Sequence, residues 1–320
     1  MTAIEKWYTV IMFISAGTGI LLGNIQIIHQ HADVFIVPFL IAMLYWIFLS
    51  IPFHKIRTAF HHRTFVYTAL GLNFIWNPLA AWGLASVFLS DYPVLMIGFI
   101  LLLVTPCTDW YLVFTNMAKG NTALSTALLP MQLILQLLLL PVYISLFGGE
   151  TAVIEISYLL ESIIIVLGLP LLASGFTKRF VSARTQDMLL SFGGSLQIIC
   201  LSLAVMCMFA ANGHVLLANI HLLWILAIPL CLFFIIAFAA GYLAARLLRF
   251  TYPHQASLIL TTLARNSPIA LAVALTAFHN EPLIAIALIL GPLLELPLLA
   301  AAAQLLLMIR QKSLYQRLKT

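Results

Sequence analysis

The sequence predicts an all-α integral membrane protein with ten transmembrane helices, arranged as two inverted five-helix repeats. The first observation behind this prediction is composition: of 320 residues, 63% are hydrophobic and only 8% are charged, whereas about a quarter of the residues of a soluble domain are charged. The second is that polar breaks interrupt the apolar runs at regular spacing, and the third is that basic residues recur in alternate breaks. The lipid bilayer is therefore the expected solvent of this chain.

Each apolar run is long enough to form a helix of about 20 residues, the length that crosses the hydrocarbon core of a bilayer. The first run lacks a small-residue cleavage site and leads directly into another run, so it is predicted to be a helix and not a signal peptide. The ten predicted spans are residues 7–28, 33–53, 64–89, 92–117, 122–147, 151–176, 186–211, 221–248, 254–278 and 282–309.

The basic residues predict the orientation of the chain. With ten spans, 14 of the 15 Lys and Arg residues fall at ends that face one side, while the alternate loops carry the acids Asp91, Glu150 and Glu281. The positive-inside rule then places both termini in the cytoplasm of a multi-pass protein of the cell membrane. The net charge of +5 is explained by these loops, so no nucleic acid is expected as a partner.

Because five helices follow an amino terminus on the inside, residues 1–149 and 150–320 are predicted to be repeats of opposite orientation. Secondary transporters often have this plan, with a binding site where interrupted helices meet near the midplane of the membrane. The fourth span of each half is interrupted near its middle, by T-P-C-T-D-W at residues 105–110 and by A-R-N-S-P at residues 264–268. Helices 4 and 9 are therefore predicted to be broken.

Two prolines, Pro106 and Pro268, are predicted to break these helices. A proline lacks the amide donor and clashes with the carbonyl four residues back, so the carbonyls of Leu102 and Ala264 lose their partners. Polar side chains gather at both breaks, among them Thr105. Those predicted to bind substrate or carry the coupling ion are Thr108, Asp109, Arg265, Asn266 and Ser267.

Arg265 is the one basic residue in the middle of a span. A charged side chain at this depth costs about 2.5 to 3.5 kcal/mol on insertion scales, so it is functional by default. Its guanidinium keeps its proton at any physiological pH, and it therefore needs an anion, which is either the substrate or a carboxylate, Asp109 or Glu295. The pairs Asn73 with Asn77 and Gln132 with Gln136 lie one helical turn apart, which suits contacts between helices as well as substrate contact.

The sequence resembles the bile acid:sodium symporter superfamily and, within it, the arsenite permeases. The resemblance is carried by T-P-C-T at residues 105–108, K-G-N at 119–121, the stretch A-R-N-S-P-I-A-L-A-V-A at 264–274 and G-P-L-L-E-L-P at 291–297. It implies that helices 4 and 9 unwind and cross in a core domain that moves against a panel domain. It also implies that Cys107 and Glu295 match the helix 4 cysteine and the helix 10 glutamate of the permeases, and that Asn266 falls at the polar break of helix 9.

The leading functional hypothesis is a secondary transporter that exports a small oxyanion or metalloid such as arsenite. Trivalent arsenic is soft and seeks thiols, so Cys107 is predicted to bind it, and Asp109 or Glu295 is predicted to carry a proton in exchange. The alternative is a sodium- or proton-coupled transporter of organic anions, in which Arg265 binds a carboxylate or sulfonate. An intramembrane enzyme is disfavoured, because Cys107 and Asp109 point away from each other on a helix. No cofactor and no resident metal are predicted.

Overall fold

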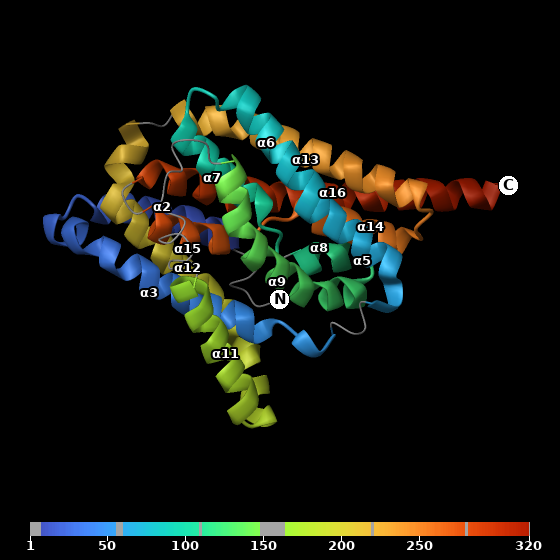
Figure 1. Ribbon diagram of the computed structural model, residues 1–320, viewed down its shortest axis with the longest axis horizontal. Coiled ribbons are helices and arrows are strands. Elements are labelled where there is room, and N and C mark those ends of the chain that lie inside the picture. The colour runs from blue at the N-terminus through green and yellow to red at the C-terminus, as the bar shows by residue number, and fades with distance from the viewer. Residues whose placement is uncertain are drawn as a thin grey trace.

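A computed structural model describes residues 8–55, 60–108, 111–147, 164–218, 221–278 and 281–319. Within these ranges the protein is helical and contains no strand (Figure 1). The first half contains α2 (Tyr8–Leu22), α3 (Gln26–Ser50), the 3₁₀ turns η1 (Phe53–Lys55) and η2 (Phe60–His62), α5 (Arg63–Gly71), the π-helical turn η3 (Leu72–Trp76), α6 (Asn77–Phe88), α7 (Pro93–Val104), α8 (Tyr111–Met117) and α9 (Thr122–Phe147).

The second half contains a π-helical turn and six α-helices in its described residues. These elements are η5 (Ile164–Gly168), α11 (Leu169–Phe180), α12 (Ala183–Ala218), α13 (His221–Leu247), α14 (Tyr252–Leu263), α15 (Ser267–Ala277) and α16 (Pro282–Lys319). Among the described residues, five stretches are long and apolar enough to cross a membrane: Gln26–Ser50, Thr122–Phe147, Arg184–His214, Trp224–Leu247 and Leu294–Gln311. A multi-pass membrane protein follows from these lengths and compositions.

Several helix ends differ from the predicted spans. The second helix begins at Gln26 and not at residue 33, because the chain turns at Gly23–Ile25 and the polar residues that follow it are already helical. Helices α12 and α16 run past the predicted ends at residues 211 and 309. An apolar run marks only the part of a helix that lies in lipid, whereas the backbone can stay helical beyond it. The first half of the sixth predicted span, residues 151–163, lies outside the described residues.

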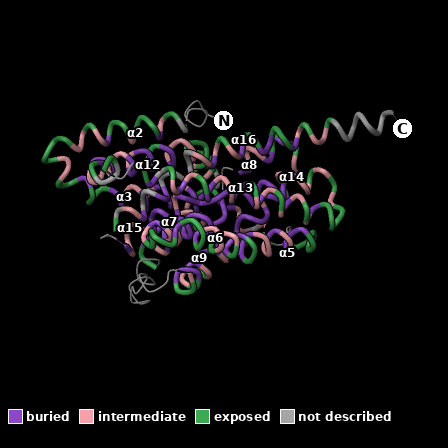
Figure 2. The backbone as a smooth tube through the Cα atoms, turned by 90° about the horizontal axis from the view of Figure 1, so that it is seen from above, coloured by how far each residue is buried: buried purple, intermediate pink, exposed green. Residues whose placement is uncertain are grey.

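The helices pack as two groups. Helix α12 lies along α3 and α2, and α11 packs on α3, whereas α7 packs on α16 and α6, α14 packs on α13, and α15 packs on α16. Figure 1 shows α2, α3 and α11 at one side of the molecule and α14 at the other, and Figure 2 shows the buried backbone concentrated around α7 in the middle. The broken helices thus belong to the second group, which we call the core bundle, and α2, α3, α11 and α12 form the first, the outer bundle.

Close helix packing fixes one half of the first broken helix. A Cβ atom added at Gly98 of α7 would lie 2.5 Å from the backbone oxygen of Ile284 in α16. Real carbon and oxygen atoms do not approach so closely, so the glycine lets the two backbones come into direct contact. Helix α7 is therefore held against α16 just before the break.

Candidate functional site: the crossing of two broken helices

The two helix breaks lie against each other. Helix α7 ends at Val104 and α14 ends at Leu263, and extended residues follow each of them. The backbone amide of Cys107 donates to the carbonyl of Ala264 (3.0 Å), and the amide of Asn266 donates to the carbonyl of Thr105 (2.7 Å). These two hydrogen bonds form a short antiparallel bridge between Pro106 and Arg265. We call this contact the crossing.

The carbonyls that the prolines release find partners within the crossing. Pro268 removes the intrahelical donor for Ala264, whose carbonyl instead accepts from the Cys107 amide. The hydroxyl of Thr105 donates to the carbonyls of Leu101 and Leu102, each at 3.0 Å. Each break therefore satisfies its exposed backbone with the other break or with its own threonine, as apolar surroundings require.

The side chain of Asn266 joins the two breaks. Its oxygen accepts from the amide of Ile269 (3.2 Å) and so caps the amino end of α15, while its nitrogen donates to the hydroxyl of Thr108 (3.0 Å). Asparagine at this position satisfies one of the free amides that begin every helix. The same amide group therefore fixes both α15 and the chain that follows Cys107.

Arg265 fixes the crossing from its other side. The guanidinium donates from Nε to the carbonyl of Leu263 (3.2 Å) and from Nη1 to the carbonyl of Leu103 (2.8 Å). Nη2 donates to the carbonyl of Thr262 and to Oδ1 of Asn73 (2.8 Å). At least four of the five N–H groups that an arginine carries are thus bound to protein oxygens.

Glu295 of α16 meets the second break through the backbone. Its Oε1 atom accepts from the amide of Arg265 (2.7 Å), and its charge interacts with that of the guanidinium. The other predicted partner, Asp109, lies outside the described residues. The carboxylate of Glu295 therefore sits beside the crossing, at hydrogen-bonding distance from its backbone.

Every predicted site residue that the structure describes lies at the crossing, and all of them except the half-buried Pro268 are buried. Cys107, Thr108 and Ser267 are 3%, 1% and 3% exposed, and Glu295, at 5%, is the most open of the set. The predicted breaking residues Pro106 and Pro268 lie at the bridge and in the first turn of α15. Residues 158 and 161 positions apart in the sequence, Thr108 and Thr105 with Asn266, thus meet in one small polar region inside an apolar bundle.

The structure adds two residues to the site that the sequence did not assign to it. Asn73 lies in the π-helical turn η3 and accepts from the guanidinium, and Phe233 of α13 lies below the guanidinium, with its ring centre 5.7 Å from Cζ of Arg265. Asn77 donates to Asn73 (3.3 Å) and to the carbonyl of Thr262 (3.0 Å). The one-turn spacing of the two asparagines was the signal for this contact, whereas nothing in the sequence singled out Phe233.

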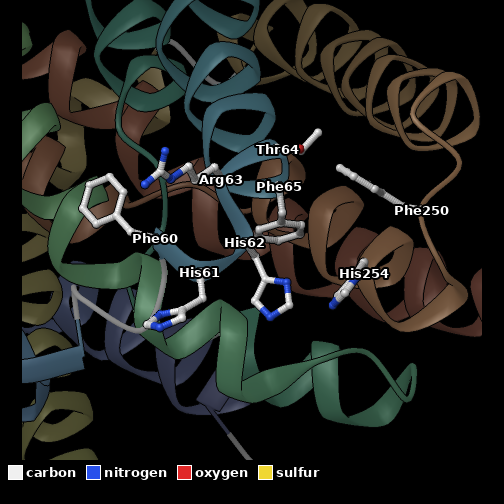
Figure 3. Close-up of a pocket in the computed structure, with 8 residues that line it drawn as sticks. All are labelled: Phe60, His61, His62, Arg63, Thr64, Phe65, Phe250 and His254. Atoms are coloured by element: carbon white, nitrogen blue, oxygen red, sulfur yellow. The ribbon is translucent and has the colours of Figure 1, made fainter.

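A separate cavity of about 630 Å³ is lined by residues 60–65 together with Phe250 and His254. The rings of His62 and His254 lie edge to face with centres 5.2 Å apart, and Figure 3 shows Arg63 pointing away from them. No residue of the crossing lines this cavity. In the part of the chain that the structure describes, no group of three or more His, Cys, Asp or Glu residues could hold a metal ion.

The chain is similar to several transport proteins. The arsenical-resistance protein Acr3 of Corynebacterium glutamicum is 25% identical over 288 residues, which cover 85% of this chain and 78% of that protein. The protein of the same name from Alkaliphilus metalliredigens is 23% identical and covers 80% of this chain and 76% of its own length. An uncharacterized sodium-dependent transporter of Bacillus subtilis, YocS, is 30% identical over 65% of this chain and 63% of its own length.

The model of one protein family, described as the Sodium Bile acid symporter family, matches residues 37–219. The match covers more than half of the chain and includes the first helix break. Members of this family are transporters and not enzymes, and the buried crossing and apolar helices described above fit a membrane transporter. We conclude that the chain belongs to the Sodium Bile acid symporter family.

Proposed function

We propose that this protein exports a small neutral metalloid or oxyanion, with arsenite as the substrate, in exchange for protons. The observation that carries the proposal is the burial of one thiol, Cys107, in the same crossing as the buried polar residues Thr108, Asn266, Ser267 and Glu295. The names of the two arsenical-resistance relatives point in the same direction.

The chemistry of Cys107 suits a substrate that must be released again. Trivalent arsenic binds sulfur more strongly than oxygen, because arsenic and sulfur are both soft whereas oxygen is hard. Since Cys107 is the one cysteine of this chain in the break sequences, it offers a single thiol and not a cage of three. The hydroxyl and amide groups of Thr108, Ser267 and Asn266 complete the proposed contacts by hydrogen bonds to the hydroxyls of arsenous acid.

The contacts of Arg265 favour an uncharged substrate. An organic anion needs a cation with open donors, yet at least four N–H groups of this guanidinium already bind protein oxygens. Arsenous acid is neutral at pH 7 and therefore does not need a cation with open donors. We therefore propose that Arg265 contributes to binding by shaping the crossing, while the substrate contacts the opposite side at Cys107.

Glu295 is the proposed proton carrier among the described residues. Its Oε1 atom accepts from the Arg265 amide, and this bond can persist whether or not Oε2 carries a proton. The carboxyl group of Glu295 can therefore gain and lose a proton while its hydrogen bond to the Arg265 amide is kept. Asp109 stays a second proposed carrier, because it adjoins the same break in the sequence.

The proposal includes an orientation with both termini in the cytoplasm, supported by the alternation of basic residues. Single cysteines introduced at Ser182 and at Thr151, which lies outside the described residues, into a chain without other cysteines are expected to react with an impermeant thiol reagent from opposite faces. Reaction of both from the same face would contradict the inverted repeats.

Flux into everted membrane vesicles tests the function directly. Arsenite uptake driven by an imposed proton gradient, and unchanged when sodium is replaced by choline, is expected. Antimonite, taurocholate and a simple carboxylate serve as competing substrates in the same assay. Uptake of taurocholate driven by a sodium gradient would instead favour the organic-anion alternative. The name of the sodium-dependent relative from Bacillus subtilis supports the coupling to sodium in that alternative.

A further inference from the structure

Two half-helices end at the crossing with the same polarity. Helices α7 and α14 both finish there, at Val104 and Leu263. The last carbonyls of a helix lack intrahelical partners and carry a partial negative charge, equivalent to about half an electron per helix end. Two such ends side by side in an apolar bundle therefore create a place that attracts a cation.

Oxygen atoms from both ends converge on one group. The carbonyl of Leu103 comes from α7, and those of Thr262 and Leu263 come from α14. Oδ1 of Asn73 supplies a fourth oxygen, and the face of Phe233 lies below. In secondary transporters, carbonyls at the ends of interrupted helices are the ligands that coordinate a coupling ion such as sodium. Here all four oxygens accept from the guanidinium of Arg265.

We propose that Arg265 is a built-in cation that occupies this oxygen cage in place of a mobile one, so that the crossing of this protein neither needs nor admits sodium. Sodium does not fit beside the guanidinium, because the four oxygens already have donors and a second positive charge would lie next to the first at low dielectric. For transport the inference rests on the proposed function, whereas the cation cage itself can be tested without any substrate.

Arg265 acts in this proposal as a positioning residue. It holds the ends of α7 and α14 together through Leu103 and Leu263, and it is 2% exposed. Removal of its side chain takes a donor away from all four oxygen atoms, of which Oδ1 of Asn73 and the carbonyl of Thr262 keep the amide of Asn77, in a space shaped for a small planar cation. Unsatisfied buried acceptors destabilise the protein, so the altered cage should bind a free cation of the same shape.

The first experiment uses the unaltered protein, purified in detergent. Its thermal unfolding midpoint is measured in increasing sodium chloride and in matched choline chloride. We expect the two salts to give the same midpoints within error. A saturable upward shift with sodium but not with choline would overturn the inference, because it would show a sodium site in the intact protein.

The second experiment uses Arg265→Ala. We expect the unfolding midpoint to fall by about 5 to 10 °C and guanidinium chloride at millimolar concentration to restore much of the loss, with a shift that grows with the logarithm of its concentration. Choline chloride at equal ionic strength should restore nothing. The matched control is Arg246→Ala at the exposed end of α13, for which guanidinium should have no effect. No rescue of Arg265→Ala by guanidinium would contradict the inference.

A pair of substitutions keeps the test decisive if Arg265→Ala does not fold. Arg265→Lys retains a cation on a long stem, and Arg265→Met retains a similar stem without charge. We expect folded Arg265→Lys to be recovered at several times the yield of Arg265→Met, measured by size-exclusion chromatography. Equal yields of folded Arg265→Lys and Arg265→Met would contradict the inference that the positive charge of Arg265 holds the crossing together. None of these readouts depends on arsenite, so a wrong substrate would leave them unchanged.

Discussion

The two helix breaks have matching backbones and complementary side chains. Both interrupt a helix with an extended segment, and each donates one amide to a carbonyl of the other. The first break offers oxygen atoms and a thiol through Thr105, Cys107 and Thr108, whereas the second offers donors through Arg265 and Asn266. The side chains of the first break thus mainly accept hydrogen bonds from the second break, and those of the second mainly donate to the first.

The difference separates two tasks within one crossing. Arg265 and Asn266 bind the ends of three half-helices, namely α7, α14 and α15, and so set the geometry. Cys107 supplies a soft sulfur atom, and its backbone amide donates to the carbonyl of Ala264 in the bridge. Changes in the second break should therefore affect folding most, and changes at Cys107 or Glu295 should affect transport most.

The largest expected effect on transport is that of Glu295→Gln. The amide oxygen of glutamine can still accept from the Arg265 backbone, but the side chain cannot carry a proton. Proton-driven arsenite flux in vesicles should fall to background while the protein is recovered in normal amount. Glu281→Gln, at an exposed position outside the crossing, is the control. If arsenite flux through Glu295→Gln still depends on the proton gradient, a residue other than Glu295 carries the proton.

Next in size is Cys107→Ser. Serine is nearly isosteric but hard, so arsenite efflux should be lost, while the free energy of unfolding changes by about 1 kcal/mol or less. Cys231→Ser in α13 serves as the control and should transport normally. Full efflux by Cys107→Ser would remove the chemical basis for a metalloid substrate.

A double-mutant cycle measures the link between the breaks. Thr108→Val removes the acceptor for Asn266, and Asn266→Ala removes that bond together with the cap of α15, so the second change should destabilise more, by roughly 1 to 3 kcal/mol. The coupling between them should be about 1 kcal/mol, measured from unfolding midpoints. Strictly additive effects would show that the Asn266 to Thr108 bond contributes nothing.

The smallest effects concern the packing that holds each break. Gly98→Ala should destabilise by about 1 to 3 kcal/mol, because its Cβ would meet the backbone oxygen of Ile284 at 2.5 Å. Gly291→Ala should cost less, since its Cβ would meet Cδ1 of Leu102 at 2.6 Å, the movable end of a side chain. The same unfolding assay compares the two, and the reverse order would mean that α16 can shift along α7.

Much of the site could be predicted because its signals are local in the chain. Pro106 and Pro268 mark the interruptions, since a missing amide donor breaks a helix wherever it occurs. Polar residues beside them are costly in lipid, so their presence indicates function. Contacts between distant elements left no such signal: Phe233 is one of many apolar residues in α13, and only the packing of that helix brings it to Arg265.

The sequence by itself determined that this is a helical membrane protein with two broken helices, because hydrophobicity, proline and charge act through neighbouring residues. Only the tertiary structure decided what Arg265 does. The sequence required an anion or a polar partner for this cation and left substrate and carboxylate open. Folding brings the carbonyl ends of α7 and α14 to the guanidinium, because helix ends present unpaired oxygens whose direction depends on how the helices pack.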